Sequence, residues 1–217
     1  MRSHFDEQLH KLNEEMIRMG SMIEHAIEQA GILMASRDAE HARTVIAADV
    51  EVDRKEREIE TLCLRLILMQ QPVARDLRLV SSALKMITDM ERIGDQAADI
   101  AEIISMPVKG QRYVYPELLQ QMGLAAGTMV NRAVDAFVKR DVDLAHEVIE
   151  SDDVVDALFN DVKKELLQTM KKHSEFGMQL LDALMIAKYL ERIGDHACNI
   201  AEWVEYAVTG TYKGDKL

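Results

Sequence analysis

Two nearly identical segments lie 100 residues apart in this chain, and they constrain its fold more than any other feature. Residues 91–102 read ERIGDQAADIAE and residues 191–202 read ERIGDHACNIAE, so nine of twelve positions match. A second pair lies upstream at an offset of 103 residues, where VIAAD at 45–49 is echoed by VIESD at 148–152. Because both pairs keep nearly the same spacing, the sequence predicts a duplicated domain.

Each half has the apolar spacing of long helices, with apolar residues at alternating intervals of three and four. This pattern predicts three helical stretches in the first half, at about 5–34, 38–70 and 72–105. Residues 106–110 interrupt the helical pattern, and it resumes at Pro116. The second half then has the same order of helices, and Arg140-Asp141 occupies the position that Arg37-Asp38 has in the first half. We therefore expect an all-α protein made of two tandem three-helix bundles, residues 1–106 and 107–217, with the linker near 106–115.

The composition supports helices and argues against nucleic acid as a partner. Aromatic residues make up only 5% of the chain, whereas methionine occurs 14 times, which favours a helical core over a β-sandwich. The formal net charge is −12, so binding of nucleic acid is not expected. An acidic protein attracts cations or basic surfaces of partner proteins instead.

No segment has the features of a secretion signal or a membrane span. The first residues, MRSHFD, are not an apolar signal region, and the most apolar stretch, 62–69, is short and contains Arg65. Cys63 and Cys198 form no framework of paired cysteines, which fits a reducing compartment. We expect a cytoplasmic protein that does not insert into the membrane.

Stripes of carboxylates run along the repeated helices. In the first repeat they comprise Asp49 and Asp53 on one helix and Glu91, Asp95 and Asp99 on the next; in the second repeat they comprise Asp152 and Asp156, then Glu191, Asp195 and Asn199. A solvated acidic face is the simpler interpretation. However, like charges four residues apart destabilise a helix mildly, and here the arrangement occurs in both repeats.

If the second and third helices of each bundle pack side by side, these carboxylates form an oxygen-rich cluster. Such a cluster binds hard cations, namely Mg, Ca, Mn or Fe, rather than a structural zinc. We predict one metal site in each repeat. The second site is expected to be weaker because Asn199, Phe159 and Lys163 replace acids of the first repeat.

Two other residues of the repeated motif have structural interpretations. Gly94 and Gly194 lie inside helices, where glycine costs about 1 kcal/mol relative to alanine, so we expect close helix packing at both positions. Arg92 and Arg192 are expected to brace neighbouring carboxylates rather than to contact a ligand.

The paired Glu-Arg-Ile-Gly-Asp motifs, the segment QPVARDLR at 71–78 and the length of 217 residues resemble the PhoU family of bacterial phosphate-signalling regulators. The resemblance covers essentially the whole chain and implies two three-helix bundles related by pseudo-twofold symmetry. It also implies multinuclear metal binding at E(D)-x-x-x-D motifs, which are here Asp49/Asp53, Glu91/Asp95, Asp152/Asp156 and Glu191/Asp195. Asp99 extends the first set, whereas Asn199 departs from the pattern.

The same resemblance implies a function. It predicts a negative regulator of the phosphate regulon that also restrains phosphate uptake and commonly dimerises. Its partners would be the ATPase subunit of the phosphate ABC transporter and a membrane sensor histidine kinase.

Two rival interpretations use the same residues. A metal-dependent hydrolase would need an open coordination position, a general acid or base and a substrate pocket, and no such set of residues stands out in the sequence. A helical scaffold unconnected with phosphate is the other alternative. A turnover assay with metals would identify the hydrolase, and co-purification of partners would identify the scaffold; we expect no enzyme activity.

Overall fold

The computed structural model describes residues 2–108 and 110–216, and Met1, Lys109 and Leu217, which fall in the predicted bundles and linker, lie outside the described residues. The described part contains six long helices: α1 (Arg2–Ser36), α2 (Ala39–Gln70), α3 (Arg75–Ser105), α4 (Glu117–Lys139), α5 (Val142–Lys172) and α6 (Gly177–Thr209). A short 3₁₀ helix, η1 (Ser174–Phe176), precedes α6. Two short strands, β1 (Thr211–Tyr212) and β2 (Asp215–Lys216), pair in an antiparallel hairpin that the sequence did not predict.

The repeated Arg-Asp pair ends one helix and begins the next in both halves. Arg37 and Arg140 adopt left-handed backbone conformations, with φ of 50° and 57°, which stop α1 and α4. The next residue caps the following helix: Asp38 accepts hydrogen bonds from the amides of Glu40 and His41, and Asp141 accepts one from Leu144. The sequence echo is therefore a helix-to-helix turn used twice.

The third helix begins later than the position of Pro72 suggested. Gln71 and Ala74 both have positive φ, 47° and 48°, so the chain turns through residues 71–74 before α3 starts at Arg75. Pro116 does immediately precede α4, as predicted. Proline therefore marked a helix start correctly in one half and three residues early in the other.

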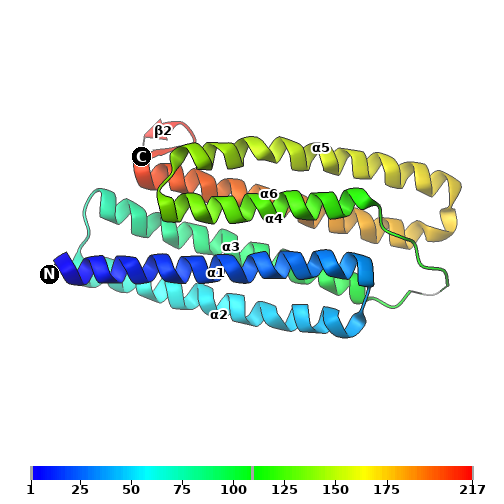
Figure 1. The fold of residues 1–217 in the computed structure, drawn as a ribbon, viewed down its shortest axis with the longest axis horizontal. Coiled ribbons are helices and arrows are strands. Elements are labelled where there is room, and N and C mark those ends of the chain that lie inside the picture. The colour runs from blue at the N-terminus through cyan, green and yellow to red at the C-terminus, as the bar shows by residue number, and fades with distance from the viewer. Residues whose placement is uncertain (1, 109, 217) are drawn as a thin grey trace.

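The two halves form matching bundles that pack side by side (Figure 1). α1, α2 and α3 make one bundle and α4, α5 and α6 the other; α3 contacts α6, and α1 contacts α4. The facing helices run in opposite directions, as expected for two bundles related by a pseudo-twofold axis. The predicted fold class is confirmed, whereas the division at residue 106 stays a prediction.

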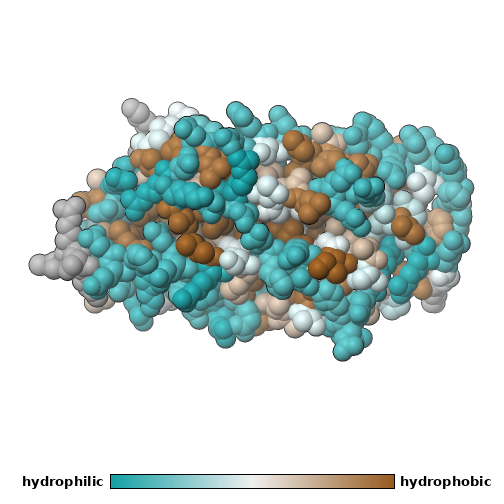
Figure 2. Space-filling view, viewed as in Figure 1, coloured by the Kyte–Doolittle hydropathy of each residue, from teal (hydrophilic) through white to brown (hydrophobic). Residues whose placement is uncertain are grey.

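One apolar core runs through both bundles. It includes the predicted stripe on α1, in which Leu12, Met16, Met19 and Ile23 are fully buried, and most of its counterpart on α4. Hydrophilic residues cover most of the visible surface, with separate apolar groups among them (Figure 2). None of the described helices is both long and apolar enough to cross a membrane.

Candidate metal centre

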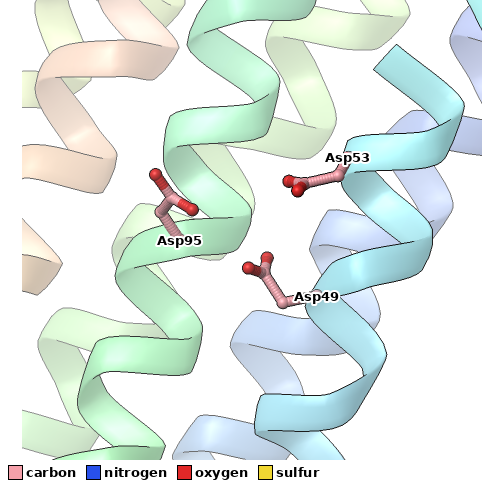
Figure 3. A group of neighbouring side chains, drawn as sticks. All are labelled: Asp49, Asp53 and Asp95. Atoms are coloured by element: carbon pink, nitrogen blue, oxygen red, sulfur yellow. The ribbon is translucent and has the colours of Figure 1, made fainter. Parts of the chain in front are cut away.

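Three aspartates meet between the second and third helices of the first bundle. Asp49 and Asp53 lie one turn apart on α2, and Asp95 faces them from α3 (Figure 3). One carboxylate oxygen of each lies within 4.8 Å of the other two, and all three residues are half-buried. The spacing of four residues on α2 turns both of its carboxylates toward the same neighbour. The structure thus brings together three of the predicted site residues.

Gly94 allows this close approach. A Cβ atom at residue 94 would lie 2.9 Å from Asp49 Oδ1 and 3.1 Å from Val52 Cγ1, so any larger residue would push against the carboxylate. Asp49 Oδ1 is buried and has no hydrogen-bond partner in the described part of the chain. The glycine of the repeated motif therefore makes room for an aspartate oxygen of the neighbouring helix, as well as for packing.

The electrostatics of this first cluster are unfavourable for the protein alone. Burial raises the pKa of Asp49 to about 6, and repulsion from Asp95, Asp53 and Asp99 adds to the rise. Burial also raises the pKa of Glu91, with Asp95 as the next cause. A group of buried or half-buried carboxylates that repel one another is stabilised when a cation neutralises it.

Two arginines contact the rim of the cluster. Arg92 Nη1 donates to Asp95 Oδ2 over 3.0 Å and its Nε lies 3.5 Å from Glu91 Oε2, so it braces neighbouring carboxylates as predicted. Arg57 Nη2 donates to Asp53 Oδ2 over 3.4 Å. Neither contact reaches the buried oxygen Oδ1 of Asp49, which accepts no hydrogen bond from the residues that the structure describes.

The second bundle repeats the central feature of the site. A Cβ atom at Gly194 would lie 3.0 Å from Asp152 Oδ1, and this oxygen is also buried with no hydrogen-bond partner among the described residues. Burial raises the pKa of Asp152 to about 6, and repulsion from Asp195, Asp156 and Glu191 adds to the rise. Four predicted residues of the second repeat therefore act on one another electrostatically.

The surroundings of this second cluster are less acidic than those of the first. Lys188 pairs with Glu191, and the ammonium groups of Lys163 and Lys188 lie 4.6 and 5.7 Å from the centre of the Phe159 ring. Among the residues described, the first cluster alone brings three donor atoms within 4.8 Å of one another. The prediction of a weaker second site agrees with this difference but stays a prediction.

Asp99 and Asn199 lie at the contact between the two bundles. Asn199 Nδ2 donates to Asp89 Oδ1 over 3.0 Å, and His196 Nδ1 lies 2.8 Å from the same oxygen. On the symmetry-related side, burial raises the pKa of Asp99 and a hydrogen bond from Tyr189 opposes that rise. The contact between Asp89 and Asn199 is thus related by the pseudo-twofold symmetry to the contact between Tyr189 and Asp99.

This pairing explains why the second repeat has an amide where the first has an acid. The partner across the interface is a carboxylate, Asp89, on one side and a hydroxyl, Tyr189, on the other. An aspartate at 199 would face Asp89 with like charge, whereas an amide donates to it. Sequence reasoning missed Asp89. The offset of 100 residues aligns it with Tyr189, and this difference between the two repeats was the signal that could have identified it.

Asn199→Asp, which restores the acid of the first repeat, is therefore expected to destabilise the protein. Loss of the amide donor and repulsion by Asp89 should lower the free energy of unfolding by about 1–3 kcal/mol. Urea denaturation measures the change. Asp89→Asn in the same chain should recover most of the loss, and an Asn199→Asp variant as stable as the wild type would contradict this account of the interface.

The donor set fits a hard cation. It consists of carboxylate oxygens, with a buried unpartnered oxygen at Asp49 and another at Asp152 that a metal could satisfy. Oxygen ligands of this kind suit Mg, Ca, Mn or Fe, as predicted from the sequence. When bound, the metal would supply positive charge that offsets the repulsion among the aspartates.

Comparison with known proteins identifies the family. A model described as the PhoU domain matches the chain twice, over residues 16–104 and 119–204. The chain belongs to the PhoU family. The phosphate-specific transport system accessory protein PhoU homolog of Clostridium acetobutylicum is 38% identical over 210 residues, which cover 96% of each chain.

Solved structures of PhoU proteins share the whole fold. The crystal structure of PhoU from Pseudomonas aeruginosa matches with a TM-score of 0.88 and 33% identity, covering 95% of this chain and 100% of that one. The phosphate transport system regulatory protein PhoU from Streptococcus pneumoniae matches with a TM-score of 0.88 and 30% identity, covering 95% and 98%. The PhoU resemblance seen in the paired motifs is thereby confirmed. These relatives are named as accessory or regulatory proteins, not as enzymes.

Proposed function

We propose that this protein is a negative regulator of the phosphate regulon and a modulator of phosphate uptake. The observation that carries the proposal is family membership over both halves of the chain, with relatives named as phosphate-specific transport system accessory proteins. In this role it connects the ATPase subunit of the phosphate ABC transporter with a sensor histidine kinase on the cytoplasmic side of the membrane, without catalysing a reaction.

The geometry supports an adaptor. Two similar bundles packed side by side offer two related sets of surfaces, which suits simultaneous contact with two partners. Signalling then consists of a shift in population between bound and released complexes. The homodimer that the family resemblance implies belongs to this proposal and would double the number of binding surfaces.

Metal binding at the aspartates is part of the proposed function. Asp49, Asp53 and Asp95, with Glu91 and Asp99 beside them, would hold the cation of the first bundle; Asp152, Asp156, Glu191 and Asp195 would hold that of the second, with Asn199 engaged by Asp89. The metal orders acidic surfaces that otherwise repel themselves. It thereby fixes the spacing of α2 against α3 and of α5 against α6.

Deletion of the gene from its host tests the regulatory role. Alkaline phosphatase activity in phosphate-rich medium should rise to the level otherwise reached only in phosphate starvation. The deletion strain carrying the wild-type gene on a plasmid is the control and should show low activity. Unchanged low activity in the deletion strain would refute a role in phosphate repression.

A further inference from the structure

The pseudo-twofold symmetry is broken where α1 packs against α4. With the offset of 103 residues, Gly20 corresponds to Gly123 and Gly31 to Val134. Val134 fills the space over Gly20, because a Cβ atom at Gly20 would lie 2.9 Å from Val134 Cγ1. Symmetry places residue 31 in the same relation to Gly123, but there the valine is replaced by a second glycine.

An open groove of about 880 Å³ lies between α1 and α4, with Gly31 on its wall. Gly31, Gly123 and Gly127 line it, and Gly31 is the open one of the three. A Cβ atom at Gly31 would meet nothing within 4 Å, whereas one at Gly123 or Gly127 would lie 3.5 Å from Met34 Cε or Ile27 Cγ2. Glycine destabilises the interior of a helix, so packing within the chain does not account for Gly31. The side chains of Ile32 and Leu124, 45% and 74% exposed, flank the groove on a face where Figure 2 shows apolar groups.

The rim of the α1–α4 groove carries negative charge. Glu24 and Glu28 lie on the α1 side, and Asn131 Nδ2 donates to Glu24 Oε1 across the groove over 2.9 Å. Of the basic groups on this rim, Arg132 is paired with Glu147, and His25 Nδ1 lies 3.8 Å from Glu28 Oε2. A second copy of this chain, with net charge −12, would bring its own acidic groove to this one, so self-association here is opposed by like charges.

We propose that the α1–α4 groove is the docking site for a helix of another protein, with apolar side chains on one face and Lys or Arg on both flanks. Gly31 lets the backbone of that helix approach closely, Ile32 and Leu124 contact its apolar face, and Glu24 and Glu28 attract its flanks. The inference rests on the proposed adaptor function, which requires a binding surface, but on neither carboxylate cluster.

Binding of a synthetic helical peptide tests the groove directly. The probe carries leucines spaced three and four residues apart and lysines on both flanks of that stripe, and its binding is followed by fluorescence anisotropy. Saturable binding to the wild type is expected, and Gly31→Val, which copies Val134, should weaken it roughly tenfold or more. The same variant should be at least as stable as the wild type, because valine is less unfavourable than glycine in a helix interior.

The controls separate docking from structural effects. Gly177→Val is the matched substitution, since a Cβ atom there also meets nothing within 4 Å, and it should leave peptide binding unchanged. Leu124→Lys, at an exposed position, should weaken binding without unfolding the protein. A peptide with glutamates in place of its lysines should bind poorly.

Absence of saturable binding, or binding that Gly31→Val and Leu124→Lys do not weaken, would overturn the proposal. A wild-type dimer that Gly31→Val dissociates in sedimentation would also overturn it, in favour of a second copy as the occupant. Neither result bears on phosphate repression, which the deletion strain measures independently, so failure of the groove and failure of the proposed function are distinguishable.

Discussion

Adding a divalent cation to metal-free protein is expected to raise its unfolding temperature, and Asp49→Asn combined with Asp95→Asn should remove most of that rise. At a cation concentration of 100 times the Kd, binding adds about 2.7 kcal/mol to stability. For a protein of this size each kcal/mol corresponds to about 2–4 °C. Differential scanning calorimetry with and without Mg, Ca, Mn or Fe(II), after treatment with a chelator, measures the shift.

A control with the same change of charge shows whether the effect is local. Asp135 and Asp161 are exposed and pair with lysines of their own helices, so Asp135→Asn with Asp161→Asn removes two charges away from both clusters. This control should keep the full metal-dependent shift. Without metal, the cluster variant should be at least as stable as the wild type, because repulsion is reduced. Equal metal-dependent shifts in all three proteins would contradict the proposed centre.

The metal-free protein should also show a characteristic pH dependence. Asp49 and Asp152 have a pKa of about 6 in the folded protein, against an ordinary value of 3.8. Between these values the folded state holds more protons than the unfolded state, so stability falls as pH rises from about 4 to about 6. Saturating metal should flatten this fall, since the cation takes the place of the protons.

Gly94→Ala is expected to abolish most of the metal-dependent rise in unfolding temperature while changing the stability of the metal-free protein little. The added Cβ atom would lie 2.9 Å from Asp49 Oδ1, so we expect the Asp49 carboxylate to turn away from α3 and from the other two aspartates. The contact with Val52 costs stability, and the gain of about 1 kcal/mol from replacing glycine in a helix offsets part of that cost. Calorimetry of the variant with and without metal gives both quantities.

Gly31→Ala is the matched control for Gly94→Ala. It makes the same substitution in a helix interior where the new atom meets nothing within 4 Å. It should stabilise the protein by about 1 kcal/mol and leave the metal-dependent shift unchanged. If Gly94→Ala kept the full shift, Asp49 could not be the ligand that this glycine accommodates.

The sequence predicted the parts of the fold that depend on local pattern. Three- and four-residue spacing and the internal repeat predicted six helices, and the four-residue spacing of Asp49 and Asp53 placed both on one face of α2. Their meeting with Asp95 required a further assumption, that α2 packs beside α3. The structure confirms that packing, and Gly94 is the residue that accommodates it.

What could not be predicted depends on contacts between distant helices. Periodicity gives the buried face of α3 and of α6 but not their relative register, so the contact of Asp89 with Asn199 was not visible. The late start of α3 depends on the positive φ of Ala74, a conformation that alanine rarely adopts. The groove beside Gly31 depends on how α1 packs against α4, which helical periodicity does not give.

The claim that this protein represses the phosphate regulon through its metal centre is tested most directly by alkaline phosphatase activity. The deletion strain is grown in phosphate-rich medium and carries variants of this gene at equal protein levels. The wild type and the Asp135→Asn, Asp161→Asn control should repress the enzyme fully. The variant that combines Asp49→Asn with Asp95→Asn should leave activity high. Full repression by the cluster variant would show that regulation does not use this metal centre, and failure of the wild type to repress would contradict the proposed function itself.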